Sequence, residues 1–481
     1  MASRSNSIDE LWRLSAADSA LGLQQGDFSA LELMDSILTR MEERNPGINA
    51  VVVDLGESAR EAAEQADQSR KQGDRLGPLH GIPVTTKINI DQAGTATSNG
   101  LPVLAQQIAT EDSPVVRNLR AAGAVIFGRT NTPEFSMRAT TVNPLFGRTH
   151  NPWHSEASAG GSSGGAGAAA AAGIGAIHHG NDIGGSLRFP AFANGVCTVK
   201  PTLGRVPAFI PSATAERGLL AQLMSVQGVI AREVADVRLG LKALSQGDAR
   251  DPWWVPAPFD EWNDSPPKRV ALTRESHGYP MHPEIEAGLD RAAAMLREAG
   301  YEVTEVETPS IEKPARAWQN VAVAEIRATL GDLARQHGSD EVNRIFEFFY
   351  AIGDLVDDTG YRIGVAERTA LTREWNLFLE DYPLILSPFM MRSLYPHDYD
   401  AQGLEENRDL LTASIYSMGV NYLSLPAGVM PLGLADEMPA GIQIIGRRFR
   451  EDLILQAMQE IEDRNGIFVH QLWKREEDGN G

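Results

Sequence analysis

Cysteine is nearly absent from this sequence of 481 residues, because Cys197 is its one cysteine. No disulfide can form within the chain, and a reducing compartment is compatible with that composition. Cys197 lies in the apolar run 195–199, which favours a buried structural thiol over a nucleophile.

Long hydrophobic runs are also missing. The most apolar long tract, 164–177, is too short and too rich in Gly and Ala to cross a bilayer, which needs about 20 residues. Residues 1–9 lack the apolar centre of a signal peptide. We therefore expect a cytoplasmic protein without a membrane segment.

Positive charge is scarce, with 43 Lys and Arg against 64 Asp and Glu and a net charge of −21. Such an acidic chain is a poor candidate for binding nucleic acid. The sequence has neither a His-Glu-x-x-His nor a Cys-x-x-Cys motif, so we expect no metal and no cofactor. The apolar fraction of 42% is ordinary for a globular protein.

The order of predicted elements indicates an α/β fold, because strand-like and helix-like segments alternate. In the first half we expect helices over 8–24, 29–44, 57–72 and 113–123, and strands over 48–53, 81–90 and 124–127. In the second half we expect a strand and then a helix over 226–245, strands over 269–272, 301–307, 384–388, 422–426 and 441–446, and helices over 283–299, 312–337, 340–380 and 450–463. The acidic tail 476–481 is expected to be disordered.

Two serines flanked by glycine, Ser162 and Ser186, stand 24 residues apart and dominate the sequence. Glycines let the backbone turn sharply and can aim several N–H groups at one spot. A helix that began at Ser186 would favour negative charge there. A hydroxyl nucleophile beside such donors suits acyl transfer.

The alternative is that these glycines only punctuate a loop and that the Ala tract is a tightly packed helix. The residues over 166–177 are small and apolar, which indicates a buried element and no flexible linker. The Gly-x-Ser-x-Gly elbow of esterases is absent around Ser186.

Few residues in the sequence could act as a base for these serines. His178 and His179 are the nearest histidines, and we expect them in a helix-to-loop segment before Asn181. Lys87 lies in an apolar strand-like run, where its side chain could reach to solvent. Burial would instead lower the pKa of its amine and make it a base.

At this point the sequence resembles the amidase signature family of serine hydrolases, first through the segment from Gly160 to Pro190. The resemblance extends over much of the chain, and its further motifs are 81–84 with Lys87, 143–147, 151–153, 200–202, 425–428 and 439–446. The sequences of 143–153 and 182–190 are most similar to those of members like fatty acid amide hydrolase. The resemblance implies a large mixed, twisted β-sheet covered by α-helices on both faces.

The resemblance also implies the roles of the site residues. Lys87 would be the base, Ser162 a bridging serine on a cis peptide bond, and Ser186 the nucleophile. The oxyanion hole would consist of the N–H groups of Ile183, Gly184, Gly185 and Ser186. Supporting residues would be Ser163, Asp182 and Arg188, with an ion pair to Asp182 as the more ordinary role of Arg188.

The substrate pocket is less well marked. The resemblance places Ser136 and Met137 in the acyl site, whereas Arg138 could face either the pocket or solvent. Two residues depart from the family pattern. Ile88 stands where relatives often have Asp, and Asn181 stands where they often have Thr. Both departures bear on the detail of the pocket and not on the reaction.

We divide the chain into a catalytic part (1–250), a lobe that is expected to cover the substrate pocket (251–381) and a closing part that completes the sheet (382–481). The resemblance implies hydrolysis of a small carboxamide through an acyl-enzyme, with esters, anilides or carbamates as further substrates. Alternatives are the glutaminase component of a tRNA-dependent amidotransferase and an inactive binding protein of the same fold. We expect a monomer or homodimer.

Overall fold

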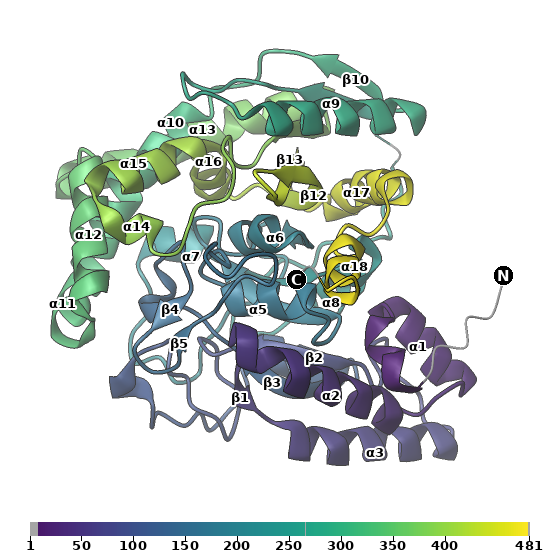
Figure 1. The fold of residues 1–481 in the computed structure, drawn as a ribbon. Coiled ribbons are helices and arrows are strands. Elements are labelled where there is room, and N and C mark those ends of the chain that lie inside the picture. The colour runs from purple at the N-terminus through teal and green to yellow at the C-terminus, as the bar shows by residue number, and fades with distance from the viewer. Residues whose placement is uncertain (1–7, 265, 480–481) are drawn as a thin grey trace.

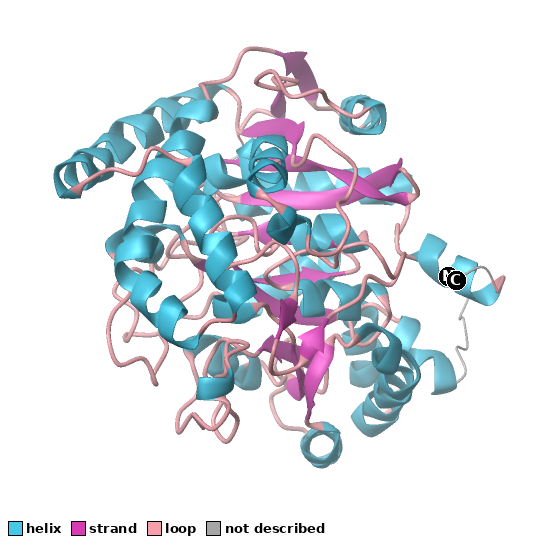
Figure 2. Ribbon diagram, turned by 60° about the vertical axis from the view of Figure 1, so that its left-hand side comes forward, coloured by secondary structure: helices cyan, strands magenta, loops and turns pink. Residues whose placement is uncertain are grey.

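The computed structural model describes residues 8–264 and 266–479. One mixed sheet of 11 strands runs through the middle of the molecule (Figure 1). Helices lie on both sides of the stacked strands (Figure 2), as the family resemblance implied. In spatial order the strands are β1 (Val51–Asp54), β3 (Val125–Thr130), β2 (Pro83–Lys87), β6 (Ile177–Asp182), β8 (Val226–Ala231), β7 (Cys197–Lys200), β12 (Ala427–Ala435), β13 (Met438–Gly446), β11 (Leu384–Pro388), β9 (Arg269–Leu272) and β10 (Glu302–Glu305).

Strand direction determines where the site forms. β2 pairs in parallel with both β3 and β6, whereas β6, β8, β7, β12, β13 and β11 pair antiparallel in succession. At the far edge β11, β9 and β10 are parallel again. Since carboxyl ends of parallel strands meet at one edge, the ends of β2 and β6 lie together. A separate hairpin consists of β4 (Val142–Asn143) and β5 (Gly147–Arg148).

The helices of the first half cover the β1 side of the sheet and its centre (Figure 1). They are η1 (Ile8–Arg13), α1 (Ala16–Gln25), α2 (Ala30–Ile48), α3 (Gly56–Gln72), η2 (Pro102–Leu104), α4 (Pro114–Ala121), η3 (Glu134–Ser136), α5 (Gly164–Ala171), α6 (Arg188–Asn194), α7 (Leu219–Met224) and α8 (Val234–Leu244). The start of α2 is the capping box that the sequence predicts, with Ser29 and Glu32 bonded reciprocally.

The helices of the second half include a group, α10 to α16, that gathers on one side of the molecule (Figure 1). They are α9 (Pro283–Glu298), α10 (Glu312–Ala317), a π-helical turn η4 (Trp318–Ala322), α11 (Val323–His337), α12 (Asp340–Ile352), α13 (Asp358–Asp381), α14 (Tyr399–Gln402), α15 (Leu404–Ala413), α16 (Ile415–Leu423), α17 (Glu451–Asn465) and α18 (His470–Glu477). Within this group α12 packs against α14 and α15.

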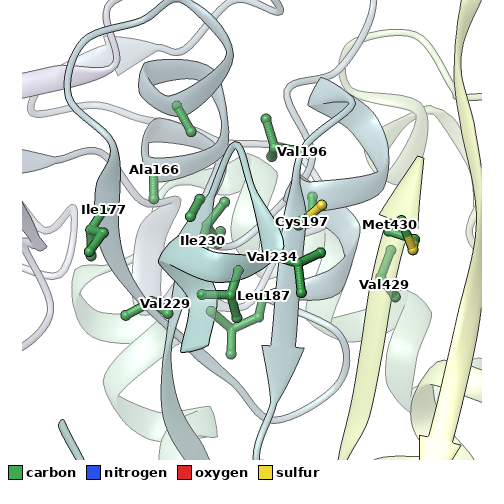
Figure 3. Packing of buried hydrophobic residues seen from close by; sticks show 14 of the residues in the cluster. Ala166, Ile177, Leu187, Val196, Cys197, Val229, Ile230, Val234, Val429 and Met430 are labelled. Atoms are coloured by element: carbon green, nitrogen blue, oxygen red, sulfur yellow. The ribbon is translucent and has the colours of Figure 1, made fainter. Parts of the chain in front are cut away.

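The core joins both halves of the chain. Side chains of Ala166 on α5, Ile177 on β6, Val229 on β8 and Val429 on β12 belong to one buried cluster (Figure 3). Every residue of α5 is Gly or Ala and all are buried. A Cβ added at Gly165 would lie 2.4 Å from the main-chain nitrogen of Asn131, so the close approach excludes a larger residue. The predicted buried element is confirmed.

Three of the predicted elements are wrong. Residues 422–426 end α16 and lead into β12. Every residue of α16 except Ile415 is buried, so the helix has no exposed polar face and its sequence resembles that of a strand. His178 and His179 lie on β6, and α6 begins at Arg188, two residues after Ser186. In the tail, Glu476 belongs to α18 and accepts a hydrogen bond from Arg40 Nη2 at 2.9 Å, while 480–481 lie outside the described residues.

Candidate active site

Lys87 is the last residue of β2, and its side chain is 0% exposed. The parallel pairing of β2 and β6 places it beside Asn181 near the end of β6. Lys87 Nζ lies 2.8 Å from Ser162 Oγ, 3.1 Å from Ser163 Oγ and 2.8 Å from Asn181 Oδ1. The interpretation that Lys87 reaches to solvent is therefore wrong, because its amine meets both serines inside the protein.

Burial changes the acid–base chemistry of this amine. Removal from water disfavours the ammonium form and lowers the pKa of Lys87 well below its ordinary 10.5, while the charge of Asp182 opposes the shift. The neutral amine carries a lone pair and can accept a proton. Lys87 therefore has the surroundings of a base.

Ser162 and Ser163 stand in the tight loop that leads into α5. The Gly161–Ser162 peptide bond is cis, as the resemblance implied. A Cβ added at Gly161 would lie 2.2 Å from the carbonyl oxygen of Arg138, so glycine is required for this loop to pack against its neighbour. The loop thus presents both hydroxyls to Lys87.

Asp182 organises the loop between β6 and α6. Its carboxylate accepts hydrogen bonds from the N–H of Gly185 at 2.8 Å and of Leu187 at 3.2 Å. Arg188 Nε lies 3.0 Å from Asp182 Oδ2, so the predicted ion pair is present, and both side chains are buried. Burial raises the pKa of Asp182, but Arg188 more than offsets it, and the pKa falls to about 2. The loop is therefore held by a permanent carboxylate.

Arg188 extends this clamp to the C-terminal part of the chain. It donates to Gln443 Oε1 at 3.0 Å, to the Ser417 carbonyl oxygen at 3.1 Å and to Asn421 Oδ1. Asn421 Nδ2 donates in turn to Asp182 Oδ1 at 2.9 Å. Helix α16 and strand β13 thereby fix the loop that carries Ser186.

The N–H groups of Ile183, Gly184 and Ser186 have no hydrogen-bond partner within the part of the chain that the structure describes. Ser186 itself is half-buried and accessible. The Gly185 N–H is different, because it already donates to Asp182. The oxyanion hole stays a prediction: in the structure the Gly185 N–H supports the loop, and the N–H groups of the other three residues are the available donors.

A largely apolar pocket opens beside Ser186. Its lining combines the loop after β3, the loop before α6 and helices from the second half of the chain. The apolar lining residues are Met137, Ile183, Phe189, Trp318, Phe349, Leu410, Leu411 and Met418, and the polar ones include Ser136, Arg138, Asp400 and Asn407. All three residues predicted for substrate binding, Ser136, Met137 and Arg138, thus lie in its wall.

Trp318 connects the helical cover with the loop of Ser186. Its indole Nε1 donates to the carbonyl oxygen of Ile183 at 3.0 Å. A Cβ added at Gly184 would lie 3.1 Å from the indole ring, so the ring packs directly on this loop. The ring therefore helps to fix the peptide groups from which the free N–H groups project.

Arg138 is buried among carboxylates and does not reach solvent. Its guanidinium bonds Asp400 through Nη2 at 2.8 Å, Asp398 at 3.0 Å, and Glu341 on α12. Burial lowers the pKa of Arg138, but these carboxylates more than offset it and raise the pKa above its ordinary value. Its donors are already engaged, so Arg138 is part of the pocket wall with its charge compensated.

The histidines beside this site are neutral. Burial lowers the pKa of both His178 and His179 to about 3. His179 Nδ1 accepts the main-chain N–H of Lys87 at 3.3 Å, and its Nε2 lies 2.9 Å from Gln227 Oε1. These contacts of His179 support strand β2. Lys87 is therefore the side chain that can act as a base next to the serines.

Asn89 and Asn181 contact Lys87 or its partners. Sequence reasoning connected Asn181 with the detail of the pocket, and it did not find Asn89. Asn181 Oδ1 accepts from Lys87, and its Nδ2 donates to Asn89 Oδ1 at 3.0 Å. Asn89 Nδ2 donates to Ser136 Oγ at 2.9 Å. The departure from the family pattern at Asn181 was the one signal in the sequence that pointed to this pair.

Residues 8–264 and 266–479 contain no group of three or more His, Cys, Asp or Glu side chains that could hold a metal ion. Cys197 is buried, and burial raises the pKa of its thiol, which agrees with a structural thiol. Among the same residues, no helix is both long and apolar enough to cross a membrane.

Comparison with known proteins identifies the class. A family model described as amidase matches residues 32–455, so the chain belongs to the amidase family. Its relatives include an indoleacetamide hydrolase and an acylamidase, and the chain is an amide hydrolase, an enzyme that cleaves carboxamide C–N bonds. The resemblance to the amidase signature family is thereby confirmed.

Several relatives are similar over nearly the whole chain. An indoleacetamide hydrolase of Bradyrhizobium diazoefficiens is 45% identical over 465 residues, which cover 96% of this chain and 89% of the relative. An acylamidase of Rhodococcus erythropolis is 33% identical over 93% of this chain and 95% of its own. One component of the glutamyl-tRNA(Gln) amidotransferase of Moorella thermoacetica is 32% identical over 94% of this chain and 97% of its own.

Solved structures agree with the fold. A bacterial aryl acylamidase of the amidase signature family superimposes with a TM-score of 0.82 at 26% identity, covering 96% of this chain and 98% of its own. A fatty acid amide hydrolase has a TM-score of 0.81 at 22% identity, covering 97% of this chain and 87% of its own, and so shares the fold.

Proposed function

We propose that the chain hydrolyses its amide through Lys87, Ser162 and Ser186. The observation that carries this proposal is the buried amine of Lys87, 2.8 Å from Ser162 Oγ. In the first step Lys87 takes the Ser162 proton, Ser162 takes the Ser186 proton, and Ser186 Oγ bonds to the substrate carbonyl carbon. The carbonyl oxygen becomes an oxyanion that the free N–H groups beside Ser186 stabilise.

Collapse of this intermediate releases the amine. The C–N bond breaks, its electron pair stays on nitrogen, and the proton held on Lys87 returns through Ser162 to that nitrogen. A water molecule then loses a proton along the same route and attacks the ester of Ser186. The products are the free acid and the amine, and Ser186 regains its proton.

We propose an arylacetamide as the substrate class, with indole-3-acetamide as the first compound to test. The pocket beside Ser186 is lined by rings and aliphatic side chains, which include Phe189, Trp318 and Phe349. An aromatic acyl group can bury its surface there. The similarity to an indoleacetamide hydrolase at 45% identity supports the same choice.

The glutaminase alternative has less support. Glutamine carries an ammonium and a carboxylate next to its side chain, and both need charged partners in a binding site. The guanidinium of Arg138 in the pocket wall is already bonded to Asp400, Asp398 and Glu341. The amidotransferase relative is also less similar, at 32% identity, than the indoleacetamide hydrolase.

The test uses the purified chain alone, without partner proteins. Indole-3-acetamide, phenylacetamide, an acetanilide and L-glutamine are each supplied, and release of ammonia or aniline is measured. We expect turnover of the arylacetamides and none of glutamine. Turnover of glutamine alone, or activity only after a partner chain is added, would contradict the proposal.

The monomer-or-homodimer state and the cytoplasmic location stay predictions. Light scattering on the purified chain measures the first. Fractionation of cells that express the untagged chain measures the second.

A further inference from the structure

Lys87 Nζ has three polar neighbours, and its lone pair can point to only one of them. A neutral amine has two N–H groups and one lone pair, and a base must aim the lone pair at the proton that it takes. The neighbours are Ser162 Oγ, Ser163 Oγ and Asn181 Oδ1, at 2.8, 3.1 and 2.8 Å. Two of them must accept the N–H groups if the third is to meet the lone pair.

The hydrogen bonds of two neighbours settle the assignment. An amide oxygen can only accept, so Asn181 Oδ1 takes one N–H of Lys87. Ser163 directs its own proton to the main-chain carbonyl oxygen of Asn181 at 3.4 Å, so its Oγ takes the second N–H. The lone pair is left facing Ser162.

This assignment depends on which end of the Asn181 amide faces Lys87, and a chain of polar contacts fixes that end. Ser136 Oγ donates to Asn99 Oδ1 at 2.7 Å and accepts from Asn89 Nδ2 at 2.9 Å. Asn89 Oδ1 accepts from Asn181 Nδ2 at 3.0 Å, and Asn89 Nδ2 also donates to Asn181 Oδ1 at 3.3 Å. The oxygen of Asn181 then faces the lysine.

We propose that Asn181 is a positioning residue that directs the lone pair of Lys87 to Ser162. The inference rests on the proposed function, because it takes Lys87 as the base. Asn181 does not touch the reacting atoms, and it acts through the lysine. Its amide is oriented through Asn89 and Ser136, and Ser136 lies in the pocket wall.

The titratable groups around Lys87 determine which group a pH profile of activity reports. Asp182 and His179 face it from β6, and Arg129 on β3 donates to its carbonyl oxygen at 3.0 Å. The pKa of Asp182 is about 2, that of His179 about 3 and that of Arg129 about 10. Lys200 on β7 interacts with Asp182 and Arg188, and burial lowers its pKa to about 7, so it titrates in the same range as Lys87. A rise of activity between about pH 4 and 9 is therefore assigned to Lys87 only if Lys87→Ala removes it and Lys200→Met does not.

Two substitutions at Asn181 move this rise in opposite directions. Asn181→Asp places a carboxylate beside Lys87 Nζ. The negative charge favours the ammonium form, so the rise of activity moves to a pH that is about 1–3 higher. Asn181→Leu removes an acceptor of the ammonium, so the rise moves to lower pH. The leucine also frees the amine to rotate, and the plateau rate falls about 10²-fold.

The experiment measures inactivation of the full chain by a fluorophosphonate across pH 5–10. Asn181→Thr serves as the conservative variant, since its hydroxyl can still accept and β-branched residues suit strands. We expect it to retain the wild-type profile within about tenfold in rate. Asn320→Asp is the control for charge, because it makes the same change of charge on η4, where Asn320 Oδ1 accepts from the Asp354 N–H.

The outcomes distinguish a failure of Lys87 as the base from a failure of Asn181 as its positioning residue. A rise that persists unchanged in Lys87→Ala would overturn the proposed base itself. A rise that disappears in Lys87→Ala but stays in place in both Asn181→Asp and Asn181→Leu would overturn only the role of Asn181. Thermal unfolding of each variant shows that it is folded, and Asn181→Asp, which keeps the size of the side chain, decides the matter if Asn181→Leu is not folded.

Discussion

Three serines meet Lys87 or its neighbours, and they differ in the groups beside them. Ser186 adjoins the free N–H groups of Ile183 and Gly184, whereas Ser162 and Ser163 face the lysine amine. A fluorophosphonate should therefore label Ser186, and Ser186→Ala should abolish labelling. Mass spectrometry of tryptic peptides locates the adduct.

The other two serines provide the controls. Ser162→Ala should slow labelling about 10²–10⁴-fold without moving its site, because the proton route is broken while the nucleophile remains. Ser163→Ala should be the mildest of the three, since Ser163 bonds the lysine and the Asn181 carbonyl oxygen but lies outside the proposed proton route. An adduct on Ser162 or Ser163 in the wild-type chain would reverse the order of roles.

The next prediction concerns the charge of the side chain at residue 87, which we expect to control activity. Burial lowers the pKa of Lys87, so activity should rise with pH as the ammonium loses its proton and level off above the lowered pKa. Lys87→Ala should remove most activity. Lys87→Arg should not restore it, because a guanidinium stays charged at every pH of the assay. Near-normal kcat in Lys87→Arg would rule out a proton-accepting role.

At the scale of elements, the π-helical turn η4 holds the loop of Ser186, the proposed nucleophile, through one indole hydrogen bond from Trp318 to Ile183. Trp318→Phe keeps the ring and loses this bond, whose net value is about 1 kcal/mol. We expect kcat to fall about 5- to 10-fold with a smaller change in KM.

A matched control exists in the same chain. Trp254 Nε1 donates to the Ser245 carbonyl oxygen at 3.2 Å, outside the pocket lining. Trp254→Phe removes the same kind of bond and should leave kcat unchanged. Equal losses of kcat in both variants would indicate a general loss of stability and no special role for Trp318.

Sequence patterns predicted elements well where one face is polar and poorly where every face is buried. The capping box at Ser29 marked the start of α2, and the periodicity behind it was sufficient to predict the helix. Every residue of α16 except Ile415 is buried, so no exposed polar face gave its sequence a helical period, and 422–426 were assigned to a strand.

The same limit applies to the site. Lys87, Ser162 and Ser186 stand in local motifs that sequence reasoning could find. The partners of Arg138 at Glu341, Asp398 and Asp400 are more than 200 residues away, and only the fold brings them together. Local patterns contain no trace of such contacts.

At the scale of the whole molecule, the proposed mechanism takes its base and its anion-stabilising donors from the chain itself. Prolonged dialysis against EDTA should therefore leave turnover unchanged, since residues 8–264 and 266–479 contain no metal-ligand group. Metal analysis of the dialysed enzyme confirms that the treatment worked. A loss of turnover that zinc or manganese restores would show that a metal site exists.

The division into 1–250, 251–381 and 382–481 stays a prediction. β9 and β10 of the middle segment continue the same sheet as β11 of the last segment. Limited proteolysis tests whether the middle segment can be released intact.

The clamp on Asp182 also has a consequence for the synthesis of the enzyme. Every proposed catalytic residue precedes position 190, but Arg188 is bonded to Ser417, Asn421 and Gln443. A ribosome therefore completes the whole catalytic set long before the residues that hold it in place have emerged. Chains released early, such as a fragment ending at residue 400, should neither turn over amide nor react with a fluorophosphonate, so activity appears only when translation is almost finished.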